Sequence, residues 1–149
     1  MIDLVLAIAH HLLVFGLVAM LAMEAALLRG PGITSAQTRS LSRLDAGYGA
    51  TAGLILVVGV LRVLFGAKGW DYYADNPWFW GKMASFAAVG LLSLPPTLRF
   101  VSWRRALTLN PAFVPDPAEI VRTRRFLSLQ AIGVAFIVVF AAAMARWAG

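Results

Sequence analysis

The sequence predicts an all-α integral membrane protein, a four-helix bundle that forms one transmembrane domain. The chain has 149 residues, of which 60% are hydrophobic and 13% charged, and its mean hydropathy is +0.78. Four long apolar stretches are separated by short polar segments rich in proline and glycine, and about 20 apolar residues suffice to cross the hydrocarbon core of a bilayer. The main partner of the chain is therefore expected to be the lipid bilayer.

The first predicted span, residues 2–28, is an apolar run broken only by Asp3, His10, His11 and Glu24. A signal peptide would begin with basic residues and have a shorter apolar stretch. Ionisable residues are costly inside a membrane, so they normally face the protein interior and mark a site. This span is expected to carry functional side chains.

Three further spans are predicted at residues 41–66, 77–101 and 118–147. The second contains a Gly49 to Gly53 pair, a GxxxG pattern that favours close approach of a neighbouring backbone, in this chain or in a second copy within a homodimer. We expect the segment between the second and third spans to be a loop, because it is short and polar apart from its aromatic residues.

The start and the middle of the third span carry distinct signals. The aromatic residues around its start resemble an interfacial belt. Pro95 and Pro96 lie inside the span and remove backbone donors, so the helix should kink and leave carbonyl groups for another side chain to satisfy.

Basic residues predict the orientation in the membrane. Nine arginines flank the first and third connections, whereas four basic residues lie toward the other side: Arg62, Lys68, Lys82 and Arg146. The positive-inside rule then places the arginine-rich connections in the cytoplasm of a bacterium and both termini on the periplasmic side of the inner membrane. With this distribution the net charge of +6 is an orientation signal, and no nucleic-acid-binding module is visible.

Helical geometry separates the two adjacent histidines. At about 100° per residue, Asp3, His10 and Glu24 belong to one heptad series, so an inward-facing Glu24 implies an inward-facing His10. His11 is turned about 100° away from His10. We therefore predict His10 as the principal site residue and a metal ligand, with His11 as the second choice.

Three spans place basic groups in one layer. At 1.5 Å rise per residue, His10, Arg62 and Lys82 lie about 10, 6 and 8 Å below the outer surface. The polar and small residues of the second span share one face, which we expect to point inward: Asp45, Tyr48, Ala52, Ile55, Gly59 and Arg62. Alternatively, Arg62 and Lys82 each snorkel to the interface, and His10 is a hydrogen-bonded interior histidine.

A second layer near the cytoplasmic side contains Glu24, Arg43, Asp45 and Tyr48. The favoured interpretation is an ion-pair network that holds the first two helices together. The alternative is a proton or electron-acceptor site.

An imidazole among cations, surrounded by apolar residues, suits haem b as the cofactor. Haem iron binds histidine, the porphyrin needs apolar walls, and its two propionates bind Arg or Lys. The other axial position would be empty, or filled by Lys82 or by a histidine of a second protomer. The chain has no cysteine, which excludes covalent c-type haem and thiolate metal sites.

The four-span plan, His10 and His11, and the segment Asn-Pro-Trp-Phe-Trp-Gly-Lys that ends at Lys82 resemble a family of small predicted bacterial membrane proteins. More remotely they are similar to the HemJ-type protoporphyrinogen oxidases. That resemblance implies bound haem b and a functional pair formed by a first-helix histidine, His10 or His11, and Lys82. The end of the first span departs from the HemJ pattern.

Three functions follow as hypotheses. The leading one is a haem b redox protein, with Lys82 as catalytic residue, that transfers electrons to or from a quinone or a redox partner or oxidises a tetrapyrrole. The others are a small metal or solute transporter and a structural subunit of a membrane complex. Copper is disfavoured because Met20 lies about 15 Å along the helix from His10. No hydrolase motif is visible.

Overall fold

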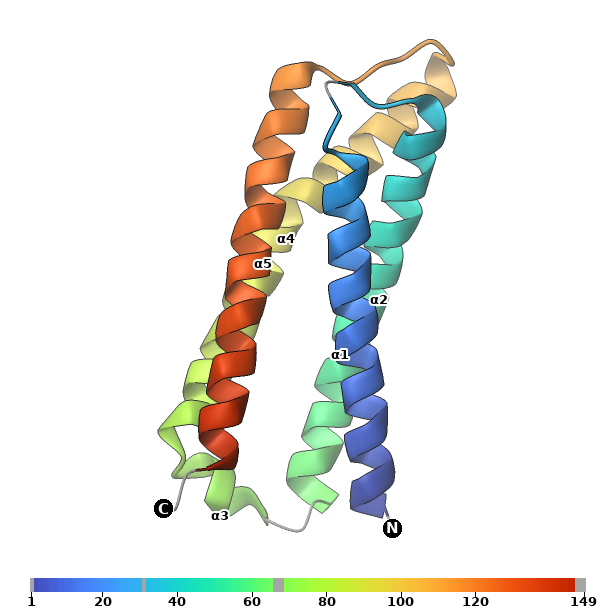
Figure 1. The fold of residues 1–149 in the computed structure, drawn as a ribbon. Coiled ribbons are helices and arrows are strands. Elements are labelled where there is room, and N and C mark those ends of the chain that lie inside the picture. Colours follow the sequence, from blue (N-terminus) through green and yellow to red (C-terminus); the bar gives the residue numbers. More distant parts are fainter. Residues whose placement is uncertain (1, 31, 66–68, 147–149) are drawn as a thin grey trace.

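The computed structural model describes residues 2–30, 32–65 and 69–146. This part of the chain contains helices and no strand (Figure 1). Four of its helices are long and apolar enough to cross a membrane, which confirms the predicted fold class of a helical membrane bundle. The helices are α1 (Ile2–Leu27), α2 (Ser35–Phe65), α3 (Gly69–Ala74), α4 (Pro77–Leu109) and α5 (Pro117–Ala145).

Several helix limits differ from those expected from hydropathy. α2 begins at Ser35 because Thr34 and Gln37 form a capping box: the Thr34 N–H donates to Gln37 Oε1 at 2.7 Å, and the Gln37 N–H donates to Thr34 Oγ1 at 3.2 Å. α4 continues past its apolar stretch to Leu109, since arginine and leucine are good helix formers. The predicted ends at residues 66 and 147, and Lys68, lie outside the described residues.

The sequence predicted a loop between the second and third spans. The structure shows that this connection is partly helical. It contains α3, six residues long, which begins at Gly69 with a φ of +72°. The Tyr72 hydroxyl donates to the carbonyl of Met144 at 2.8 Å, so α3 is attached to the last turn of α5. Asn76 then caps α4 by accepting from the Trp78 N–H, and Pro77 occupies the first helical position.

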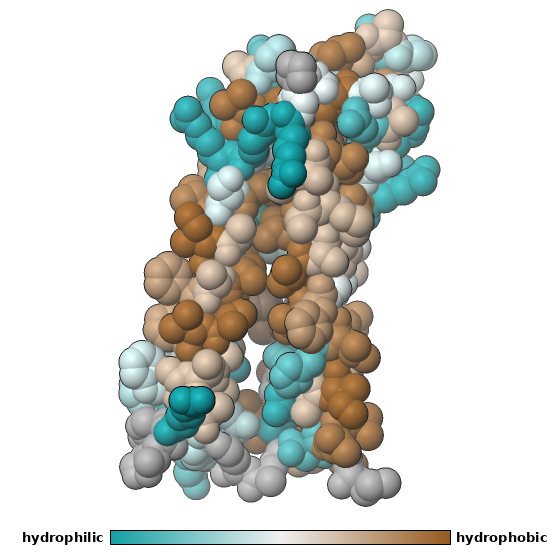
Figure 2. All heavy atoms as spheres, in the orientation of Figure 1, coloured by the Kyte–Doolittle hydropathy of each residue, from teal (hydrophilic) through white to brown (hydrophobic). Residues whose placement is uncertain are grey.

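The four long helices form a ring in the order α1, α2, α4, α5. α1 pairs closely with α2 and α4 with α5, whereas α1 and α5 share the least contact of any ring neighbours. One end of the ring, the α3 end, contains Ile2, α3 and Ala145; the other, the loop end, contains connections 28–34 and 110–116 (Figure 1). A hydrophobic belt lies between hydrophilic groups near the two ends (Figure 2).

The loop end is closely packed around Trp103, which is only 1% exposed. Its indole N–H donates to Glu119 Oε2 at 2.8 Å, and the other carboxylate oxygen of Glu119 pairs with Arg99. Arg124 on α5 donates to the carbonyl oxygens of Leu28 and Gly30. It thereby satisfies carbonyl groups left free where α1 ends.

The proline pair in α4 leaves a backbone carbonyl group for another side chain to satisfy, as predicted. Pro96 has no N–H to donate to the Leu92 carbonyl, and Gln130 Nε2 of α5 donates to this oxygen at 3.4 Å. Gln130 is buried, so its side chain satisfies a backbone carbonyl group of α4 inside the bundle. Figure 1 shows α4 leaning across the bundle, from beside α5 at the α3 end to beside α2 at the loop end.

The tightest glycine contact is not at the GxxxG pattern. A Cβ atom added at Gly49 or Gly53 would meet no described residue within 4 Å, so the expected packing there is wrong within the described part of this chain. A Cβ atom at Gly133 of α5 would lie 2.5 Å from Val89 Cγ2 of α4. Gly133 therefore sets the spacing between these two helices.

Candidate functional site

A cavity of about 260 Å³ lies inside the ring toward the α3 end. All five helices contribute to its wall, which is mostly apolar and includes His10, Arg62, Tyr73, Phe79, Lys82 and Val134. In Figure 2 the molecular surface is hollowed in its lower half, between the α1–α2 pair and the α4–α5 pair. The helix pairs therefore enclose a space that can accept a ligand from within the membrane.

The structure places His10, and not His11, on the cavity wall. His10 packs beside Gly59, where an added Cβ atom would lie 3.8 Å from its Cε1. Its Nδ1 is buried without a hydrogen-bond partner among the described residues. His11 is exposed, and its Nδ1 lies 2.6 Å from the carbonyl oxygen of Ala7 in its own helix. The inward position of His10 agrees with the helical geometry, and its role as a ligand stays a prediction.

Arg62 and Lys82 reach the same cavity from α2 and α4. The Lys82 ammonium lies 5.7 Å from the centre of the Phe79 ring, and Arg62 Nε is buried without a hydrogen-bond partner in the described part of the chain. Both side chains interact electrostatically with His10. Among the described residues no Asp or Glu lines the cavity, so its basic groups have no counter-ion there. An apolar space with unpaired cations favours an anionic ligand.

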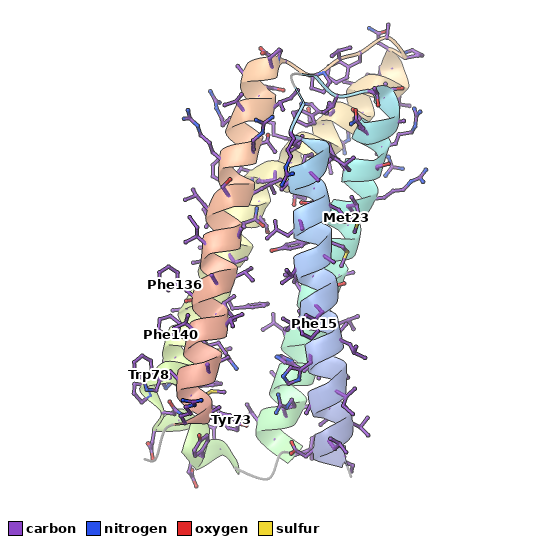
Figure 3. All side chains as sticks on the ribbon, viewed as in Figure 1. Phe15, Met23, Tyr73, Trp78, Phe136 and Phe140 are labelled. Carbon is purple, nitrogen blue, oxygen red and sulfur yellow. The ribbon has the colours of Figure 1, made fainter. Side chains whose placement is uncertain are left out.

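The base of the cavity is formed by aromatic residues of α3, which the sequence had indicated only as part of an interfacial belt. Trp70 and Tyr73 line the cavity. Tyr73 also contacts Phe79, with ring centres 5.5 Å apart. Figure 3 shows Tyr73 at the foot of the bundle. Asn76 strengthens the attachment of this region, because its Nδ2 donates to the Met144 carbonyl at 3.3 Å.

Other aromatic residues form a row on the outside of the α4–α5 pair. Trp78, Phe136 and Phe140 project away from the bundle (Figure 3). The ring centre of Phe140 lies 6.1 Å from that of Trp78 and 6.3 Å from that of Phe136. Phe140 also packs on Gly81, where an added Cβ atom would lie 3.3 Å from its ring. These residues face the lipid and do not contribute to the cavity.

The second predicted layer is a real cluster but not an ion-pair network. Glu24, Asp45 and Tyr48 are buried together toward the loop end, whereas Arg43 is exposed. Within the described residues, the only salt bridge joins Arg99 to Glu119. The expected pairing with Arg43 is therefore wrong, because the Arg43 side chain is exposed.

Comparison with known proteins identifies the family. The sequence profile of a family described as predicted membrane protein (DUF2214) matches residues 2–149. The chain belongs to this family. No curated protein and no solved structure matches the chain. Family membership agrees with the four membrane-spanning helices, and the remote similarity to HemJ-type oxidases has no counterpart among these findings.

Proposed function

We propose that the chain binds haem b in the cavity and serves as a redox protein of the inner membrane. The supporting observation is that one apolar cavity brings together His10, Arg62 and Lys82 from three helices. This combination of one imidazole, two cations and apolar walls matches the iron, the propionates and the porphyrin of haem b. Quinones or a membrane redox partner are the expected electron donors or acceptors.

The donor set fits the cofactor. A buried imidazole nitrogen without a hydrogen bond costs free energy, and His10 Nδ1 is such an atom. The ring of His10 would bind the iron and so employ this otherwise unsatisfied side chain. His11 is directed away and would take no part.

The two cations fit the propionates. Arg62 Nε has no hydrogen-bond partner among the described residues, so its guanidinium has donors available for a carboxylate. Lys82, which lies over Phe79, would bind the second propionate, bind the iron, or hold a carboxylate of a tetrapyrrole substrate in a HemJ-like reaction. In the last case Lys82 would be the catalytic residue.

Haem supplies one-electron chemistry when bound, and the chain would supply the surroundings. The apolar walls exclude water from the ring, and the cations beside His10 favour the electron-rich form of a bound group. The site lies toward the α3 end, and the arginine distribution predicts that this end is periplasmic.

The first test is the absorption spectrum of the purified protein, oxidised and reduced, with a pyridine haemochrome assay. We expect a Soret band and stoichiometric b-type haem. His10→Ala should lose the cofactor, and the matched variant His11→Ala should retain it. Equal retention in both variants, or a colourless folded protein, would overturn the proposal.

A second candidate, favoured by the size of the cavity, is binding or transport of a smaller anionic amphiphile. The volume of about 260 Å³ lies below the roughly 300–1,000 Å³ usual for pockets that bury a drug-sized ligand. Native mass spectrometry of the colourless protein would then show a bound carboxylate. The double variant Arg62→Gln, Lys82→Gln should lose this ligand. A structural subunit would show neither ligand and would purify only with its complex.

The proposed orientation can be tested because the chain has no cysteine. A single cysteine at Asp71, exposed on α3, should react with a membrane-impermeant maleimide applied to intact cells. One at Ala112, exposed in the connection at the loop end, should react only after lysis. The reverse pattern would contradict the predicted topology.

A further inference from the structure

Two carboxyl groups are buried inside the bundle, away from the cavity. Glu24 on α1 is 2% exposed and Asp45 on α2 is 8% exposed. They are close enough to interact electrostatically with each other and with Tyr48, which is also buried. Glu24 lies fourteen residues beyond His10 on the same helix, or about 21 Å along its axis. The cluster is thus separate from the proposed haem site.

No cation neutralises this pair within the part of the chain that the structure describes. Arg43, on the same helix as Asp45, is exposed. Arg99 of α4 pairs with Glu119. Arg124 of α5 donates to backbone carbonyl oxygens at the end of α1. The charged groups that the packed helices offer are therefore engaged elsewhere or directed outward.

The hydrogen bonds of the two carboxyl groups are unequal. Asp45 Oδ1 accepts from the Thr97 hydroxyl of α4 at 2.8 Å. Glu24 Oε1 is buried and has no hydrogen-bond partner among the residues that the structure describes. An ionised carboxylate can only accept hydrogen bonds, whereas a protonated one also donates. Two electrostatically interacting carboxylates without a cation cannot both remain ionised in an apolar interior at acceptable cost.

We propose that Glu24 and Asp45 form a proton-binding site in the loop-end half of the membrane. Glu24 holds the proton, and Asp45, fixed by Thr97, is the neighbouring acceptor. Glu24 lies in the last turn of α1, so the proton exchanges with the side of the membrane that carries the arginine-rich connections. The protein therefore takes up or releases a proton there, independently of what occupies the cavity.

The test uses the intact protein in detergent and dicyclohexylcarbodiimide, an apolar reagent that reacts with protonated carboxyl groups. Peptide mass spectrometry should find the adduct on Glu24, with labelling that falls as the pH rises. Glu119, paired with Arg99, is the internal control and should remain unlabelled. Glu24→Gln should abolish the adduct, and His10→Ala should leave it unchanged.

Infrared spectroscopy gives an independent measurement that needs no reagent to enter the bundle. The wild-type protein should show the carbonyl stretch of a protonated carboxylic acid, sensitive to deuterium exchange, and Glu24→Gln should remove it. Absence of this band from the wild-type protein at neutral pH would overturn the proposal. Equal carbodiimide labelling of Glu24 and Glu119 would also overturn it.

Discussion

The two halves of the bundle are built from the same four long helices but pack differently. Toward the loop end, large side chains such as Phe100 and Trp103 are almost completely buried. Toward the α3 end, the helix pairs enclose a cavity, and over the whole bundle α1 and α5 share the least contact of any ring neighbours. The comparison indicates that one half holds the fold together, which leaves the other half free to bind a ligand.

The difference originates partly in α4. This helix contacts both α2 and α5, and it carries the proline pair near its middle. Because Gln130 donates to the Leu92 carbonyl oxygen, the prolines do not leave this oxygen without a hydrogen bond.

Four predictions test the contrast between the two halves of the bundle, beginning with the largest expected loss of stability.

Trp103→Ala should have the largest effect, about 3–5 kcal/mol of unfolding free energy, because it removes a buried aromatic side chain and leaves Glu119 Oε2 without its indole donor. Thermal unfolding in detergent, followed by circular dichroism, measures it. Trp70→Ala is the matched control, since Trp70 is 55% exposed at the α3 end. Equal losses in the two variants would contradict the division of the bundle into a stabilising half and a binding half.

Gly133→Ala should cost about 1–3 kcal/mol, because its methyl group would overlap Val89 and push α4 away from α5. Gly90→Ala is the control, since an added Cβ atom meets nothing within 4 Å there. Adding Val89→Ala to Gly133→Ala should restore part of the loss. A double variant no more stable than Gly133→Ala alone would show that the spacing is not set by this contact.

Gln130→Leu should cost about 0.6 kcal/mol, the average for an interhelical hydrogen bond in a membrane protein. The side chain donates to one carbonyl only, and at 3.4 Å the bond is long. Unfolding of the variant in detergent, compared with Ser128→Ala on the exposed face of α5, measures the difference. A loss as large as that of Trp103→Ala would mean that the proline segment, and not the aromatic core, controls stability.

Gly59→Ala should leave stability almost unchanged, because its Cβ atom would lie at an ordinary contact distance from His10. Gly59→Phe should fill the cavity, fold, and fail to retain ligand, which the haemochrome assay or native mass spectrometry would show. If the Gly59→Phe protein keeps its ligand, the ligand binds outside this cavity.

Much of the fold could be predicted because hydropathy and helical periodicity act locally. The inward face of α2 and the choice of His10 over His11 both follow from 100° per residue. The location of partners could not be predicted in this way. Whether Arg43 contacts Glu24 depends on how α2 packs against α1. Which glycine contacts another helix depends on how α4 and α5 pack together, and neither arrangement is encoded locally. α3 was missed because its six residues carry no hydropathy signal.

Trp70 gives the cavity a built-in optical reporter. Its indole lines the cavity, whereas Trp103 is buried toward the loop end. A light-absorbing ligand in the cavity would quench the emission of Trp70 more than that of Trp103, by energy transfer that weakens steeply with distance. Ligand entry could therefore be followed in real time without a label, and a Trp70→Phe protein would isolate the contribution of this one side chain.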